Sequence, residues 1–282
     1  MRKTIFSLLA LCTAVFAANA DSLSISPAVQ IKTPAEAHHP VLSPDGSTLL
    51  FSTQDHQGLY AYNMKTKNVT LLDEGMAAGF QPVFSKDCKK VFYYTASMID
   101  DILYRDVRSV ETASGKVKQL KKATREPIDL RSIEKSDYVT TTLKSIVIVK
   151  DGVKTEIAPI SDAHSYLWPT LSPDGKKVLF NEPFQGVFIC NIDGTNLNKI
   201  SDKGDYPCWI SDNAILVVET KDDGYVVTSS ELKLLDLETG SSAVLSQEGT
   251  KVAEITTAPN TGDVVYSTIE GKMFRTNILV IR

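Results

Sequence analysis

The sequence is poor in cysteine. It has four, one of them within the first twenty residues, and the other three are Cys88, Cys190 and Cys208. Their spacing is not that of zinc ligands, and an odd number leaves at least one thiol free. Cys190 and Cys208 could form a disulfide in an oxidising compartment, or both could be buried strand residues. We favour buried strand residues, because an unpaired cysteine behaves as a small apolar side chain.

Positive charge and histidine are also limited. There are 30 Lys and Arg residues against 34 Asp and Glu, four histidines, and a formal net charge of −4. The short basic runs Lys89-Lys90 and Lys121-Lys122 are typical of solvated turns, not of a nucleic-acid patch, so we expect no nucleic-acid partner. No Gly-x-Ser-x-Gly elbow occurs, which argues against a serine hydrolase domain.

Long apolar runs are absent after the first twenty residues, so no transmembrane segment is expected there. Residues 1–20 have the pattern of a signal peptide: Arg2 and Lys3, an apolar run over 5–18, and a small-x-small site at Ala18-Asn19-Ala20. The alternative is an uncleaved anchor, but the run is short for a bilayer. We predict cleavage before Asp21 and a periplasmic, secreted or cell-surface location. Removing Arg2 and Lys3 takes the formal charge from −4 to −6.

A repeat of about 43 residues runs through the rest of the chain. The segments 39–51 and 168–180 share Pro, Leu, Ser-Pro-Asp-Gly, Leu and Phe, and weaker copies follow the same spacing. A period of 40–45 residues with four strands per unit is the signature of a β-propeller. A sixth copy, at 255–266, has a displaced proline. The repeat prolines are Pro40, Pro82, Pro127, Pro169 and Pro207.

The Ser-Pro-Asp-Gly motif predicts a tight turn between the first two strands of a blade. Proline presets φ, aspartate caps the turn through its side chain, and glycine takes the left-handed position. In the copy at 85–88, Cys88 stands where glycine is expected. Later hairpins in each repeat, such as 59–72 and 187–200, complete a four-stranded unit.

The last repeat supplies only three strands, at 252–257, 263–268 and 273–281. An open sheet edge there would be a liability. The segment from Leu23 to Lys32 alternates in polarity, so we predict that it pairs with the last blade and closes the ring.

The repeat x-Pro-x-x-Ser-Pro-Asp-Gly-x-x-apolar-x-Phe, followed by an apolar strand and Asp-Gly-Thr-Asn-Leu, resembles that of TolB-type, WD40-like propellers. The resemblance covers nearly all of 37–282 and implies a protein-binding platform with a central channel, without chemistry. The chain lacks the separate N-terminal domain of the family namesake, so its partners are not carried over. We predict an all-β chain forming a single six-bladed β-propeller of four-stranded blades closed by an N-terminal strand. The expected blades are 37–75, 76–122, 123–162, 163–202, 203–248, and 249–282 with 23–32.

In a propeller the first strand of each blade lines the channel, so the residue before each repeat proline should lie near the channel mouth. Together with their neighbours, these residues include several aromatic side chains, a composition typical of binding surfaces. Alternatively, some of these rings fill gaps between blades. We predict that Trp168 and Tyr206 anchor a ligand. The favoured ligand is a protein or peptide, with a glycan as the second choice, and we expect the chain to be a monomer. The candidate binding residues are His39, Phe80, Gln81, Arg125, Glu126, Tyr166, Trp168, Phe184, Asp205 and Tyr206.

The sequence shows no convincing catalytic set, and we expect no metal and no cofactor. His39, Gln81 and His164 could imitate the metal ligands of propeller-fold polysaccharide lyases, which makes a lyase or another hydrolase-like enzyme the alternative function. No spaced histidine and acid motif supports it. The acidic pairs Asp100-Asp101 and Asp222-Asp223 are interpreted as solvated loop charges.

The alternating strands also predict which side chains are buried. The residues expected to face inward are Leu42, Leu50, Phe84, Phe92, Leu171, Phe180, Ile210 and Val217.

Overall fold

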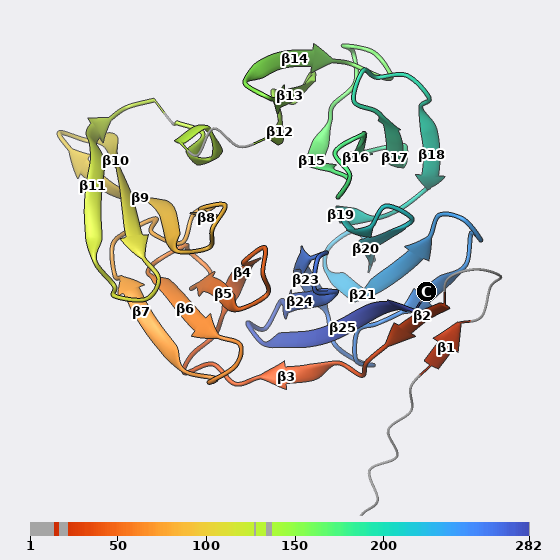
Figure 1. Cartoon of the computed structure of the whole chain (residues 1–282), viewed down its shortest axis with the longest axis horizontal. Helices are drawn as coiled ribbons and strands as arrows, with labels where there is room; N and C mark the ends of the chain where they lie inside the picture. The colour runs from red at the N-terminus through yellow and green to blue at the C-terminus, as the bar shows by residue number, and fades with distance from the viewer. Residues whose placement is uncertain (1–13, 17–21, 127, 134–136, 282) are drawn as a thin grey trace, which may run out of the picture.

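The structure is a computed structural model that describes residues 14–16, 22–126, 128–133 and 137–281. The predicted cleavage site and most of residues 1–20 lie outside the described residues. Six antiparallel sheets surround a central axis (Figure 1). In five of them the strands follow one another outward in chain order, and in the sixth the outer strands come from the N-terminal part of the chain. The predicted all-β, six-bladed propeller is therefore confirmed.

The first two blades are complete four-stranded sheets. Their innermost strands, β4 and β8, face the centre of the ring, and the outermost, β7 and β11, lie at its rim (Figure 1). The bounds are β4 (His38–Leu42), β5 (Thr48–Ser52), β6 (Leu59–Asn63), β7 (Val69–Asp73), β8 (Val83–Phe84), β9 (Lys90–Ile99), β10 (Ile102–Glu111) and β11 (Val117–Thr124).

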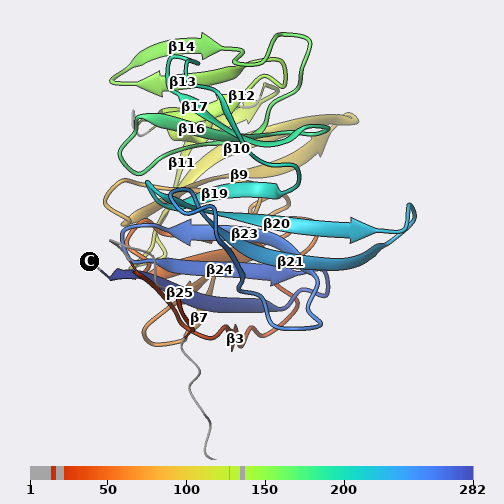
Figure 2. The ribbon, with the colours of Figure 1, turned by 90° about the vertical axis from the view of Figure 1, so that its right-hand side faces the viewer.

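The fourth and fifth blades have the same order. Their innermost strands are β15 and β19, and the long β20–β21 hairpin projects from one face of the ring (Figure 2). The bounds are β15 (Leu167–Leu171), β16 (Lys177–Glu182), β17 (Gly186–Asn191), β18 (Asn198–Ser201), β19 (Asp205–Ser211), β20 (Ala214–Asp222), β21 (Val227–Asp236) and β22 (Ser242–Val244).

The third blade departs from this plan. Its described sheet has three strands, β12 (Tyr138–Thr141), β13 (Ile146–Lys150) and β14 (Val153–Ile157), with β12 at the inner edge. A 3₁₀ helix, η1 (Leu130–Ile133), precedes β12 where an innermost strand was expected after Pro127. Leu130 is buried against the second blade, in a cluster with Phe92 and Tyr94. The segment therefore packs on its neighbour instead of extending its own sheet.

The sixth blade closes the ring with N-terminal residues, as predicted. Its strands β23 (Val252–Ala258), β24 (Asp263–Thr268) and β25 (Met273–Ile281) are joined by β2 (Ser22–Ile25) and β3 (Val29–Ile31), both antiparallel to β25. An irregular step at Ser26–Ala28 separates β2 from β3. It is still bonded to the blade, because Ser26 N–H donates to the Asn277 carbonyl at 2.9 Å. The short strand β1 (Ala14–Phe16) pairs with the outer side of β2.

The repeated turns have the predicted hydrogen bonds. Ser43 Oγ donates to Asp45 Oδ1 at 2.6 Å, and Asp45 Oδ1 accepts from Ser47 N–H at 3.0 Å. Ser85 with Asp87 and Ser172 with Asp174 repeat this arrangement. Cys88 has φ of 57° where Gly46 has 68° and Gly175 has 67°. A cysteine thus occupies the left-handed position that favours glycine, at some cost in backbone strain.

The core lies between neighbouring blades, in clusters that each combine apolar side chains from two adjacent sheets. The predicted inward-facing residues agree with this, except that Leu171 is only partly buried. Those that are buried, with 8% or less of the residue exposed, are Leu42, Leu50, Phe84, Phe92, Phe180, Ile210 and Val217.

Candidate functional site

The residue before the repeat proline has an unusual backbone in four blades. His39, Gln81, Trp168 and Tyr206 have φ between 46° and 54°. In three of these blades the strand pairing shifts register at this point, as in a β-bulge. A non-glycine residue in the left-handed region is uncommon, and such residues cluster at functional sites. Strands β4, β15 and β19 carry His39, Trp168 and Tyr206, and Gln81 lies just before β8. These four strands are the innermost of their blades and surround the centre of the ring (Figure 1).

Trp168 and Tyr206 form an aromatic pair from adjacent blades. Their ring centroids are 4.5 Å apart with planes inclined at 36°, and both side chains are partly buried. Burial raises the pKa of Tyr206, and burial also raises the pKa of the neighbouring Asp205. The two rings therefore form a partly sheltered, amphipathic surface of the kind that dominates binding hot spots.

A cavity of about 640 Å³, within the size range of ligand sites, opens beside Trp168 of this pair. It is bounded by the innermost strands of the first, second and fourth blades, by η1 and by β12. Its lining residues are Val41, Phe80, Gln81, Pro82, Val83, Tyr94, Ile128, Asp129, Leu130, Arg131, Val139, Thr140, Thr141, Trp168 and Pro169.

A second group at the mouth links the first and sixth blades. His39 Nδ1 lies 2.9 Å from Glu254 Oε1, and His39 Nε2 lies 2.9 Å from the Gln54 carbonyl. Both partners accept hydrogen bonds, so both ring nitrogens can be satisfied only when each carries a proton. His56 stacks on His39 with centroids 3.7 Å apart, and the ring of Phe80 meets His56 edge-on.

The pKa values of this group follow from the same contacts. Burial lowers the pKa of His39, but the hydrogen bonds to Glu254 and Gln54 outweigh it, so the net pKa is raised. Burial raises the pKa of Glu254, but the bonds from His39 outweigh it, so the net pKa is lowered. The pKa of His56 is lowered, first by burial and then by the nearby charge of His39. The geometry thus favours a His39 imidazolium paired with a Glu254 carboxylate, beside a neutral His56.

The remaining predicted residues lie elsewhere. Arg125 and Glu126 are exposed, but neither lines the cavity. Phe184 is 95% exposed on the turn between β16 and β17, also away from the cavity lining. The prediction that Tyr166 lies at the channel mouth is wrong. It is fully buried between the third and fourth blades, and its hydroxyl donates to the Ser161 carbonyl at 2.9 Å. Tyr166 is therefore a core residue that a ligand cannot reach.

Within the described ranges, no group of three or more His, Cys, Asp or Glu side chains is placed to hold a metal ion. His39 and His164 have different carboxylate partners: His164 Nδ1 lies 3.2 Å from Glu182 Oε1, whereas His39 Nδ1 lies 2.9 Å from Glu254 Oε1. The three cysteines of the described chain are unpaired. Burial raises the pKa of Cys190 and of Cys208 to about 12, so neither is a reactive thiolate. The described part of the chain also holds no helix long and apolar enough to span a membrane.

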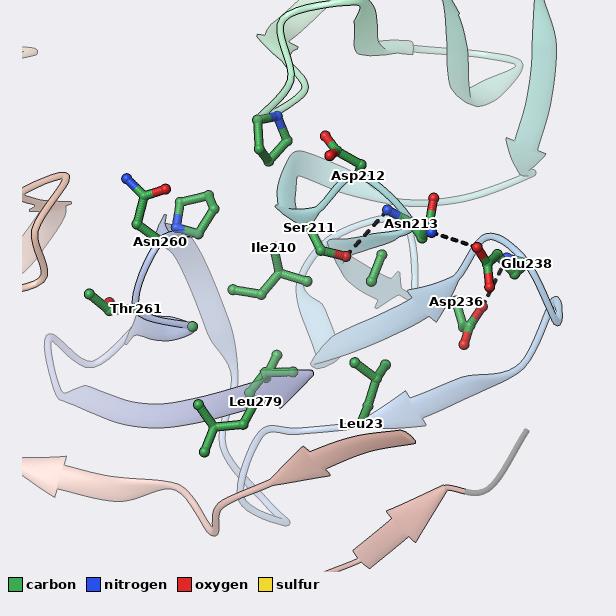
Figure 3. Close-up of a pocket in the computed structure, with 15 residues that line it drawn as sticks. Leu23, Ile210, Ser211, Asp212, Asn213, Asp236, Glu238, Asn260, Thr261 and Leu279 are labelled. Atoms are coloured by element: carbon green, nitrogen blue, oxygen red, sulfur yellow. Dashed lines mark hydrogen bonds between the residues drawn. The ribbon is translucent and has the colours of Figure 1, made fainter. Parts of the chain in front are cut away.

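A second cavity, of about 440 Å³, lies at the turns that join first and second strands (Figure 3). It is lined by turn residues of the fourth, fifth and sixth blades, including Asp212, Asn213 and Asn260, and by the closing-strand residue Leu23. Three of its polar residues are engaged with one another, since Asn213 Nδ2 donates to Glu238 and Asp236 accepts from Glu238 N–H. The cavity beside Trp168 is therefore the stronger candidate.

Three residues at the channel mouth were absent from the sequence prediction: His56, Arg131 and Glu254. Glu254 lies in the sixth repeat, whose proline is displaced, so the spacing did not align it with the other channel residues. His56 lies on the turn between β5 and β6. Arg131 belongs to the 3₁₀ helix that replaces a predicted strand.

Comparisons with known proteins bear on the fold. No family model matches the sequence, and no curated protein matches it. Among solved structures, a protein described as a TolB candidate from Agrobacterium tumefaciens aligns with TM-score 0.55 and 16% identity, over 93% of this chain and 100% of that one. Oligogalacturonate lyase from Vibrio parahaemolyticus aligns with TM-score 0.52 and 12% identity, over 95% and 96%.

The chain shares the propeller fold of these two structures. The similarity extends over nearly the whole of both chains, so it concerns the complete ring. At such low identity it shows the fold alone, and the same ring carries a TolB-like protein and a lyase. Because one fold can carry unrelated functions, the side chains at the channel mouth of this propeller bear on function more directly than the fold does.

Proposed function

We propose that the chain is a binding module of the bacterial envelope that holds a protein or peptide segment at the channel mouth. The observation that carries the proposal is the pair formed by Trp168 and Tyr206 on two backbone bulges, beside a cavity of about 640 Å³. Held by strained backbone on adjacent innermost strands, these rings lose little freedom on binding. Preorganised aromatic anchors of this kind supply most of the free energy in many interfaces.

The charges around the mouth favour this function over an enzyme that acts on an acidic polysaccharide. Asp129 is paired with Arg131 at 2.7 Å, and His39 is paired with Glu254 at 2.9 Å. Asp205 adds a further acidic group. A polyanionic substrate needs a surplus of positive charge where it binds, and these groups give none.

Export is part of the proposal. The support is the charged start, apolar run and Ala18-Asn19-Ala20 site of the sequence, together with the TolB-like neighbour. Intact-mass measurement on protein purified from its native cells should give a chain that begins at Asp21. A cytosolic chain that retains residues 1–20 would refute this part alone.

The binding function is tested with the double variant Trp168→Ala, Tyr206→Ala. In native envelopes, chemical cross-linking followed by mass spectrometry should show a partner of the unaltered protein that the double variant loses. A hot-spot ring contributes about 2 kcal/mol or more, so the loss of one ring should lower affinity for that partner about 30-fold. The loss of both rings should lower it by up to about 1,000-fold if their effects add.

The matched control is Asn260→Ala, an exposed residue of the opposite face that lines the second cavity. It should retain the partner. Circular dichroism must first show that both variants are folded. A folded double variant with an unchanged cross-linking profile would exclude the proposed site.

A further inference from the structure

Among the residues that the structure describes, no strand pairs with the inner edge of β12, which faces the channel. In the other five blades a strand occupies this innermost position, namely β4, β8, β15, β19 and β23. Within the described residues, β12 pairs with β13 alone. Unpaired strand edges are templates for the addition of another strand.

The register of β12 shows which backbone groups the edge presents. Thr142 N–H donates to the Ser145 carbonyl at 3.0 Å, so Thr142 bonds toward β13. In an antiparallel pair the backbone groups of successive residues alternate in direction, so Thr140 and Tyr138 also bond toward β13. Val139 and Thr141 must then present their N–H and C=O groups to the channel.

A side chain confirms this direction. Arg131, which lines the channel cavity, donates from Nη1 to the Val139 carbonyl at 2.6 Å. The same guanidinium is bonded to both oxygens of Asp129. Arg131 thus occupies one of the outward groups, and the N–H groups of Val139 and Thr141 and the Thr141 carbonyl face the cavity.

The space in front of this edge has the dimensions and chemistry of a strand site. The cavity of about 640 Å³ is bordered by β12 and by Pro82 and Pro169 of the flanking blades. At about 3.3 Å per residue, a segment of about four residues spans the length of β12. Asp129 and Arg131 are the charged residues of the lining and neutralise each other, while Phe80, Tyr94 and Trp168 offer apolar surface. An uncharged segment complements this lining.

The molecule itself shows that a blade can be completed from a distance. Residues 22–31 complete the sixth blade through antiparallel pairs with β25, more than 240 residues away in the chain. A blade of this propeller therefore accepts a strand that does not come from its own repeat.

We propose that an extended, uncharged segment of a partner protein adds to β12 as an antiparallel strand and takes the innermost position of the third blade. This rests on the proposed binding function and names its mode: backbone hydrogen bonds to Val139 and Thr141, with alternate side chains against the channel aromatics.

The probe is a library of random seven-residue peptides displayed on phage and selected on the full mature chain. Enriched peptides are synthesised, and each backbone nitrogen is methylated in turn. N-methylation at every second residue should weaken binding at least tenfold, because those N–H groups face β12. N-methylation at the intervening residues should change binding less than about twofold. Bound peptide should also slow hydrogen exchange of the Thr141 amide at least tenfold.

Two protein variants give a matched comparison. Thr141→Pro removes an N–H group from the inner edge, and Lys154→Pro removes one from the outer edge strand β14 of the same sheet. Peptide binding should be lost in the first and kept in the second. If Thr141→Pro does not fold, the methylation series decides on the unaltered protein.

The proposal is overturned if no peptide is enriched, if acidic sequences are enriched, if methylation at every position has the same effect, or if the Thr141 amide stays unprotected. Peptides that match a segment of this chain would also overturn it, because the occupant would then be a second copy. Binding that needs Trp168 and Tyr206 but lacks the alternation would refute strand addition and leave the proposed function standing. If the alternating effect of methylation persists in the Trp168→Ala, Tyr206→Ala double variant, strand addition stands and the two rings are refuted as the anchors of the proposed function.

Discussion

Closure of the ring depends on two apolar side chains of the N-terminal segment. Leu23 on β2 is 8% exposed and packs with the fifth and sixth blades, whereas Ile31 on β3 is 5% exposed and packs between the first and sixth. Replacing a buried Leu or Ile by Ala costs about 2–5 kcal/mol. The two residues belong to different clusters, so their effects should add, to about 4–10 kcal/mol in the double variant.

That sum is comparable to the entire stability of an ordinary domain, about 5–15 kcal/mol. Each single variant, Leu23→Ala or Ile31→Ala, should lower Tm by roughly 4–20 °C, at about 2–4 °C per kcal/mol for a chain of this size. The double variant should be marginally folded or unfolded at 25 °C. Urea unfolding followed by circular dichroism gives the free energies, and calorimetry gives Tm.

The control lies on the same strand. Val29 of β3 is 66% exposed, so Val29→Ala should change the free energy of unfolding by no more than about 0.5 kcal/mol. The reasoning fails if the double variant stays within about 1 kcal/mol of the unaltered protein, or if Val29→Ala costs as much as Ile31→Ala. Either result would mean that β2 and β3 are not what closes the ring.

Three further predictions concern the core, the mouth and the thiols. Phe180→Ala should cost about 3–5 kcal/mol in urea unfolding, because the ring is fully buried, and a cost below about 1 kcal/mol would contradict that burial. Because the pKa of His39 is raised, its ion pair should stabilise the fold fully at pH values below the ordinary histidine pKa. This stabilisation should be lost as the pH rises through the raised pKa. The lowered pKa of Glu254 makes its contribution disappear as pH falls through that value. Glu254→Gln should therefore lower the His39 pKa in an NMR titration of the ring protons, and an unchanged titration would refute the pairing. Cys190, with a pKa of about 12, should react with a thiol reagent at pH 8 only after unfolding, and rapid labelling of the folded protein would show the burial to be incorrect.

The repeat could be predicted from sequence because its signals are local. Ser-Pro-Asp-Gly forms the same turn wherever it occurs, since its hydrogen bonds join residues within five positions of one another. The turn at residues 85–88 keeps the same backbone without glycine, because Cys88 takes the left-handed conformation in its place. Four of the predicted mouth residues were also accessible to this reasoning, because each precedes a repeat proline.

The third blade marks where the local signals end. The proline at 127 fits the spacing, yet residues 130–133 form a 3₁₀ helix. Leu130 gains burial against Phe92 and Tyr94 of the second blade, and nothing in its own repeat encodes that contact. Tyr166 differs from the prediction for a similar reason. Its spacing from the repeat proline fits a mouth residue, but its ring fills the gap between two blades.

By itself, the sequence determined the fold class, the number of repeats, the turns, the alternating core and the need for a closing strand, because each follows from short-range patterns of apolar, turn-forming and charged residues. The tertiary structure alone decided which polar and aromatic residues contact one another at the channel mouth. His39 and Glu254 are 215 positions apart and become partners because ring closure places the first and sixth blades side by side. Likewise, no described strand pairs with the inner edge of β12, and η1 packs on the neighbouring blade. Both depend on burial between blades, a long-range free energy that no single repeat contains.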